Sequence, residues 1–123
     1  MDFDNNIPIY VQIIDYIKGN LVKEEINAGE KLMSVREMSE KLKVNPNTVQ
    51  RAYQELEREE ITFTKRGKGT FVTEDNNMLI RLKRELSKEI INSFISNMKE
   101  LGFNKEEIVS IISEELKGRD HDE

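Results

Sequence analysis

The chain has 123 residues and a formal net charge of −5, with 35% charged and 37% hydrophobic residues, so it has room for one compact domain with a modest core and a small appendage. It contains no cysteine, which excludes disulfides, thiolate catalysis and cysteine zinc sites and fits a reducing cytoplasm. No apolar run has the length of a signal peptide or of a bilayer span, so we expect a cytoplasmic protein without a membrane partner.

The first predicted element is a helix from Ile7 to about Glu25. Its apolar residues recur at intervals of three and four, which predicts one buried stripe. The members of this stripe are Tyr10, Ile13, Ile14, Ile17 and Leu21. A turn is expected at residues 26–30, where asparagine and glycine interrupt the pattern, and a short extended segment at residues 31–33.

The second helix is predicted by a capping box, with Ser34 at the N-cap and Glu37 three residues later. It is expected to bury Val35, Met38 and Leu42. A tight turn at residues 43–44 then leads directly into a third helix. Two short helices joined in this way indicate a helix-turn-helix.

The third helix is predicted to begin after Asn45, with a proline at its first position, and to end near Glu60. One face is apolar and should be buried; it consists of Val49, Ala52, Tyr53 and Leu56. The other face consists of hydrogen-bond donors at the same spacing, namely Asn47, Gln50, Arg51 and Gln54.

Carboxylates are distributed unevenly along this third helix. There are none from Val44 to Gln54, although helices usually favour acids in the first turn, and four follow at Glu55, Glu57, Glu59 and Glu60. The acid-free half favours an anionic partner, of which DNA in its major groove is the first candidate. The alternative is an ordinary amphipathic helix with a polar outer face.

A β-hairpin is predicted next, with strands at residues 61–64 and 70–73 around a five-residue loop. The loop, Lys65–Gly69, carries three cations and no acid. A hairpin that follows a helix-turn-helix is a wing, and a basic wing tip suits the sugar-phosphate backbone or the minor groove. The alternative is a solvated loop that happens to be basic.

Two further helices are predicted after a polar linker at residues 74–77. The first runs from Met78 to Leu101 and ends at Gly102, the second begins after Asn104, and Gly118–Glu123 should be disordered. This pair is too small to bury its own apolar face, so we expect a homodimer with two-fold symmetry. The expected interface residues are Leu79, Leu82, Leu86, Ile90, Phe94, Met98, Ile108 and Ile112.

The predicted fold is therefore mainly α with a small β-hairpin wing. Residues 1–75 form a winged helix-turn-helix domain, and residues 76–123 form a two-helix dimerisation region with a disordered tail. The net acidity does not exclude DNA, because residues 1–73 carry eleven Lys and Arg against twelve Asp and Glu, whereas residues 74–123 carry eight against twelve. A local basic footprint matters more for DNA binding than the total charge.

Several motifs, found in the same order along residues 7–73, resemble the GntR family of bacterial transcription regulators. They are Pro8–Ile13, Gly29–Leu32, Ser34–Glu37, Val44–Val49, Leu56–Glu57 and Gly67–Val72. The short two-helix tail resembles the YtrA subfamily. This resemblance implies a winged helix-turn-helix, a homodimer, a double-stranded operator of two-fold symmetry and, loosely, control of a transporter operon. A small dimer without an activation surface favours repression.

The resemblance also implies DNA contacts at matching positions. They are Arg36 in the second helix, Asn45, Asn47, Thr48, Gln50 and Arg51 in the third, and Lys65, Arg66, Gly67 and Lys68 in the wing. Gln50 stands where many relatives have arginine, which favours an adenine edge over guanine. The sequence departs from the family at two usual prolines, here Ala28 and Met33, and at two usual glycines, here Lys43 and Glu60.

An enzyme is not expected. The only histidine is His121, and the sequence contains no metal-ligand cluster and no glycine-rich phosphate loop. We therefore expect no cofactor and no metal, and no residue cluster indicates an effector pocket. The alternative from a different class is a winged-helix module that binds protein and has lost DNA binding, which the net acidity would fit.

Overall fold

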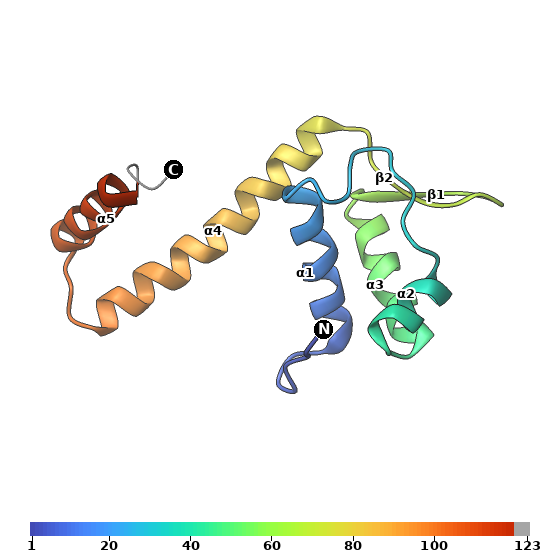
Figure 1. Cartoon of the computed structure of the whole chain (residues 1–123), viewed down its shortest axis with the longest axis horizontal. Helices are drawn as coiled ribbons and strands as arrows, with labels where there is room; N and C mark the ends of the chain where they lie inside the picture. The colour runs from blue at the N-terminus through green and yellow to red at the C-terminus, as the bar shows by residue number, and fades with distance from the viewer. Residues whose placement is uncertain (120–123) are drawn as a thin grey trace. The chain divides into compact units, whose positions relative to one another are not determined.

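The computed structural model describes residues 1–119, which form five helices and one two-stranded sheet (Figure 1). It contains two compact units, the first comprising Met1–Lys83 and the second beginning at Arg84. The elements are α1 (Ile9–Val22), α2 (Val35–Leu42), α3 (Pro46–Arg58), β1 (Thr62–Lys65), β2 (Gly69–Val72), α4 (Asn76–Glu100) and α5 (Lys105–Arg119). The predicted fold class, mainly α with a hairpin wing, is confirmed.

Helices α1 and α3 pack side by side in the same direction and form the core of the first unit (Figure 1). At their N-terminal ends, the Arg51 guanidinium lies 3.8 Å from the centre of the Tyr10 ring. At their C-terminal ends, Lys18 Nζ lies 3.2 Å from Glu59 Oε1. In each pair the two residues are 41 positions apart in the sequence. Both contacts therefore belong to a single alignment of α1 against α3. The buried residues of the two helices are Ile13, Ile14, Ile17, Leu21, Val49, Ala52, Tyr53 and Leu56.

Helix α2 begins with the predicted capping box. The Ser34 hydroxyl accepts the Glu37 N–H at 3.1 Å, and the Glu37 carboxylate accepts the Ser34 N–H at 3.1 Å. These hydrogen bonds to Ser34 lower the pKa of Glu37. Met38 and Leu42 are buried as predicted, whereas Val35 is only half-buried. The helix ends at Lys43, whose left-handed backbone (φ 57°, ψ 49°) turns the chain into α3.

The hairpin is antiparallel, with Thr62 opposite Val72 and Lys65 opposite Gly69. The loop therefore has three residues, and the predicted five-residue loop was too long because the strand pairing includes both of its end residues. A third segment lies beside β2, since Lys31 bridges to Phe71 and the Leu32 N–H donates to the Thr70 carbonyl at 2.8 Å. This segment is the short extended stretch predicted at residues 31–33.

Both long helices of the first unit end earlier than predicted. Helix α1 begins after Pro8 and stops at Val22, because Glu24 adopts a left-handed backbone with φ 61°. Helix α3 stops at Arg58, and Glu60 is left-handed with φ 63°. Because non-glycine residues rarely adopt positive φ, these turns were not evident from residue type.

Helix α4 begins two residues before the predicted start, because the Asp75 carboxylate accepts the Asn77 N–H at 2.9 Å. It ends in a Schellman motif, in which the Phe103 N–H donates to the Met98 carbonyl while Gly102 adopts φ 93°. The predicted termination at Gly102 is thus confirmed.

Helix α5 begins with a second capping box. Asn104 and Glu107 exchange hydrogen bonds of 2.9 and 3.0 Å between side chains and backbone N–H groups, as the N-cap prediction required. The predicted disorder from Gly118 was wrong for that residue and for Arg119, because α5 continues through both. The remaining four positions of that prediction lie outside the described residues.

Glycine at either of two left-handed positions should stabilise the fold. Replacing Lys43 or Glu60 should raise the free energy of unfolding by about 0.5–1 kcal/mol, because about 1–2 kcal/mol of backbone strain is removed and the extra chain entropy of glycine offsets part of it. Urea unfolding measures this change. Lys23→Gly, at a helix C-cap with φ −85°, is the matched control and should not stabilise. A loss of stability in both variants would contradict this account.

Candidate nucleic-acid interface

The first half of α3 presents polar side chains to solvent. Asn47, Gln50 and Arg51 are exposed, and Thr48 is half-buried. Asn45 is also exposed, but its carboxamide oxygen accepts the Asn47 N–H at 2.8 Å and so caps the helix. Its NH₂ group is the part left to donate outward. The structure thus places the predicted contacts of α3 together, with Asn45 serving both as a cap and as a donor.

Three of the four carboxylates in and after the second half of α3 have a partner within the first unit. Glu57 accepts the Thr64 N–H at 2.9 Å and ties the helix to β1. Glu59 pairs with Lys18 of α1, and Glu55 pairs with Arg58. Two of these acids thus bind neighbouring elements and the third binds a residue of α3 itself, and the negative charge of α3 lies at the end away from the exposed polar residues.

Arg51 is the one predicted α3 contact whose side chain is held by a neighbouring helix. Its guanidinium stacks on Tyr10 of α1, within the range of a cation–π interaction. The two residues border a shallow concavity of about 420 Å³, whose lining residues are Ile9, Tyr10, Asn45, Asn47, Thr48 and Arg51. Tyr10 was predicted as a core residue, but it is only half-buried and lies at this edge.

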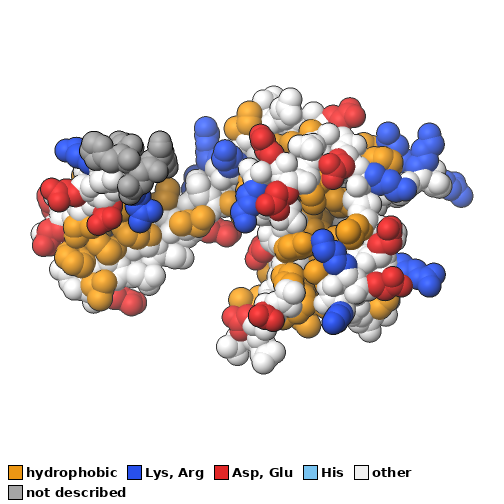
Figure 2. All heavy atoms as spheres, in the orientation of Figure 1, with side chains coloured by type: hydrophobic (Ala, Val, Ile, Leu, Met, Phe, Trp, Pro, Cys, Tyr) orange, Lys and Arg blue, Asp and Glu red, His pale blue; other side chains and the backbone are white. Residues whose placement is uncertain are grey.

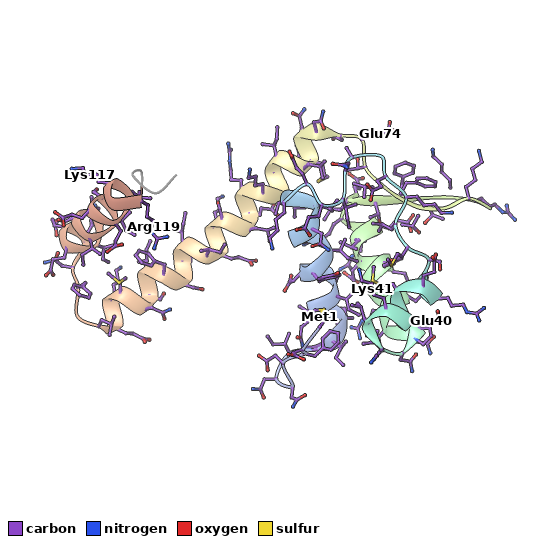
Figure 3. The ribbon with its side chains drawn as sticks, in the orientation of Figure 1. Met1, Glu40, Lys41, Glu74, Lys117 and Arg119 are labelled. Carbon is purple, nitrogen blue, oxygen red and sulfur yellow. The ribbon has the colours of Figure 1, made fainter. Side chains whose placement is uncertain are left out.

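Arg36 lies on α2, apart from the α3 residues, and its side chain is 88% exposed. Its Nε lies 3.4 Å from Glu40 Oε1 one turn later, an exposed pair that contributes little to stability. Figure 3 shows Glu40 on α2, next to Lys41, whose ammonium lies 5.9 Å from the Tyr16 ring of α1. Arg36 is therefore free to exchange Glu40 for another anion.

The wing carries its cations in two groups. Arg66 and Lys68 flank Gly67 in the loop and are exposed, and Figure 2 shows Lys and Arg side chains gathered at this tip. Lys65 instead lies over the outward face of the hairpin, with its Nζ 4.7 Å from the centre of the Phe71 ring. That ring stacks on Phe63 at 5.9 Å.

Lys31 is a wing cation that the sequence analysis did not identify. It bridges to Phe71, and its Cε lies 2.7 Å from the position that a Cβ on Gly69 would occupy. The absence of a side chain at Gly69, together with its φ of 120°, leaves room for the lysine to cross the wing. The sequence signal that could have revealed this contact was Gly69, a glycine that lies opposite an extended segment.

Tyr53 fixes α3 to the segment that precedes α2. Its hydroxyl donates to the Met33 carbonyl at 2.7 Å, across 20 residues of sequence. Burial, with a contribution from the charge of Glu37, raises the pKa of Tyr53 to about 12. The contact keeps the two helices of the helix-turn-helix in place behind their exposed faces.

Comparison with known proteins agrees with this geometry. The sequence profile of the bacterial regulatory proteins of the gntR family matches residues 9–72, which span α1 to the end of β2. The chain belongs to the GntR family. GntR proteins are transcriptional regulators rather than enzymes, and this chain is accordingly a DNA-binding transcriptional regulator.

Two relatives from Bacillus subtilis (strain 168) match nearly the whole chain. The helix-turn-helix transcriptional regulator YhcF is 47% identical, covering 94% of this chain and 96% of its own, and the transcriptional repressor YtrA is 38% identical, covering 96% and 94%. The solved structure of a GntR family transcriptional regulator from Listeria monocytogenes aligns with a TM-score of 0.84 and 46% identity, over 91% of this chain and 98% of that one. The YtrA-like resemblance is thus confirmed.

Residues 1–119 contain neither a cluster of metal ligands nor a helix suited to a membrane. Within them, no group of three or more His, Cys, Asp and Glu side chains could hold a metal ion. None of the helices in this part is both long and apolar enough to cross a membrane.

The Tyr53 hydroxyl should make stability depend on alkaline pH. Its folded pKa of about 12 lies above the unfolded value of about 10, so its contribution is complete below pH 10 and is lost as pH rises through 12. Tyr53→Phe should cost about 1 kcal/mol at neutral pH through the lost hydrogen bond and should flatten this alkaline decline. Urea unfolding at several pH values measures both effects, with Tyr16→Phe as the control. An unchanged decline in Tyr53→Phe would refute the assignment.

Proposed function

We propose that this GntR regulator represses transcription by binding a two-fold symmetric operator as a homodimer. In each subunit α3 enters the major groove, and the wing lies on the minor groove or the backbone. The observation that supports this arrangement is the exposed, acid-free first half of α3, on the same unit as a cationic hairpin. The relative YtrA is named a repressor, which agrees with this direction of control.

Separate roles follow from where the side chains lie. We assign Asn47, Thr48 and Gln50 to base edges, because they lie in the first turns of α3, where Asn47 and Gln50 are exposed and Thr48 is half-buried. Arg36, Arg51 and Lys65 each contact another side chain of this protein. We assign these three cations to backbone phosphates. Arg66, Gly67 and Lys68 form the tip that approaches the minor groove, and the NH₂ group of Asn45 donates at the edge of α3.

The dimer is proposed to form through the C-terminal helices, with residues 1–75 for DNA binding and 76–123 for dimerisation. Large apolar side chains of these helices remain in solvent in a single chain: Ile80 59%, Ile90 71%, Ile91 51%, Leu101 73%, Val109 60%, Ile112 37% and Leu116 58% exposed. Exposed apolar surface of this kind marks an interaction site. Leu79, Leu86, Phe94 and Met98 are half-buried and border it.

Two of the expected interface residues are already buried in a single chain. Leu82 and Ile108 are only 3% and 8% exposed in a single chain, so we assign them to intramolecular packing that supports the interface. We place the protein in the cytoplasm, where the operator is accessible. We propose neither a cofactor nor an effector for this regulator.

Selection of bound sequences from random duplex DNA tests the function directly. The selected sequences should contain two inverted half-sites whose centres lie about one helical turn, or a multiple of it, apart. Affinity for such a duplex should fall steeply with salt, because bound cations release counterions from the DNA. Selection that yields no symmetric sequence, or affinity that does not respond to salt, would contradict the proposal.

Gln50→Ala and Arg66→Ala should separate sequence reading from backbone binding. The first should cost roughly 1–3 kcal/mol on the selected site and relax the preference at one base pair per half-site. The second should weaken binding to all sequences and lower the salt slope by about 1. Equilibrium binding to selected and random duplexes over a salt series measures both. Equal losses for Gln50→Ala on the two duplexes would remove Gln50 from base reading.

A charge on the apolar face of α4 should dissociate the dimer. Ile90→Glu should give monomers in sedimentation and weaken operator binding, because the carboxylate would be buried without a partner in the interface. Asn92→Glu, an exposed position on the same helix, is the charge-matched control and should remain dimeric. A dimeric Ile90→Glu variant with full operator affinity would place the interface elsewhere.

A further inference from the structure

We propose that Tyr10 is a positioning residue that holds Arg51 to bind a DNA backbone phosphate in the concavity between α1 and α3. This inference rests on the proposed function, since it concerns the same DNA complex. It adds α1, which lies outside the helix-turn-helix pair, to the DNA-binding surface and gives Tyr10 a role besides packing.

The geometry of the stacked pair leaves the donors of Arg51 available. Its guanidinium carbon lies 3.8 Å from the centre of the Tyr10 ring, so one face of the planar group is covered. The N–H groups of a guanidinium lie in its plane and point away from such a ring. Stacking therefore restricts the long side chain to one region while leaving the edge that binds phosphate open to solvent.

The composition of the concavity indicates an anion. Its rim contains the side chains of Asn45, Asn47, Thr48 and Arg51, all of which can donate hydrogen bonds, and no carboxylate lines it. The carboxylates of α3 are held elsewhere, Glu57 on Thr64 and Glu59 on Lys18. A phosphodiester group supplies acceptors for these donors and the negative charge that this rim lacks.

Tyr10 can position Arg51 because its own helix is fixed relative to α3. The next residues of its stripe, Ile13, Ile14 and Ile17, are buried between the helices. The Lys18–Glu59 pair lies two turns further along in the same register. The tyrosine ring is thus attached to a rigid support, and the arginine on it loses less freedom when it binds phosphate.

Operator binding over a salt series, measured for variants of Tyr10 and Arg51, tests this role. Tyr10→Leu should lower affinity about two- to fivefold, as loss of an exposed cation–π contact implies, and should reduce the salt slope by up to about 1. Tyr10→Phe keeps the ring and should bind like the parent protein. In an Arg51→Ala background, Tyr10→Leu should cost nothing further, because the tyrosine acts through the arginine.

Tyr16→Leu is the matched control. It is another half-buried tyrosine of α1, but its nearest cation is Lys41 at 5.9 Å, and it should leave the salt slope unchanged. If Tyr10→Leu does not fold, Arg51→Lys replaces it, since lysine keeps the charge but not the stacked plane. That variant should retain most of the salt slope while losing affinity.

Three outcomes would overturn the inference. They are an unchanged affinity and slope in Tyr10→Leu, an equal loss with and without Arg51, and an Arg51→Lys variant that binds like the parent protein. Each of these leaves the proposed function intact as long as the parent protein binds its operator with steep salt dependence. Failure of the parent protein to bind any duplex would instead contradict the proposed function itself.

Discussion

The parallel packing of α1 on α3 is the constraint on which the rest of the first unit depends. Ile13, Ile17, Val49 and Leu56 are among the most deeply buried side chains of the chain, and all four lie between these helices. This packing leaves only one face of α3 for solvent. The wing, α2 and the extended segment at Lys31 are then attached around a helix whose rotation is already determined.

The carboxylates at the end of α3 differ from the polar residues at its start in role as well as in position. The carboxylates of Glu55, Glu57 and Glu59 each bind a partner within the unit, and two of these partners lie on other elements. The acids that a DNA-binding surface must avoid thus help to attach that surface to its support. A helix with the same composition but a mixed order of charges could not satisfy both requirements.

Local signals in the sequence predicted most of the fold. The Ser34 and Asn104 capping boxes and the apolar spacing of the helices depend on residues close in the chain, and the structure confirms them. Contacts between distant segments were not predictable in this way. Tyr10 was assigned to the core and Lys31 was overlooked, because their roles depend on Arg51 and Gly69. The helix end at left-handed Glu24 was not evident because glutamate does not favour that conformation, whereas at Glu60 the only indication was the glycine that the family usually has there.

Ordered motifs carried both the family resemblance and the predicted contacts, which lie on α2, on α3 and in the wing. The structure places Asn47, Gln50 and Arg51 together in solvent, but the DNA sequence that such a surface would bind is not encoded in the chain. The same holds for dimerisation. An exposed apolar face such as that around Ile90 favours burial, but it does not identify the surface that buries it.

The distribution of tyrosine gives this protein a built-in spectroscopic distinction between its two units. The chain has no tryptophan, and its three tyrosines, Tyr10, Tyr16 and Tyr53, all lie in the unit formed by Met1–Lys83. Intrinsic emission therefore follows only that unit, whereas far-ultraviolet circular dichroism follows the helices of both. Unfolding curves recorded by the two methods coincide only if the units unfold together, so the unlabelled chain can reveal whether they are thermodynamically coupled.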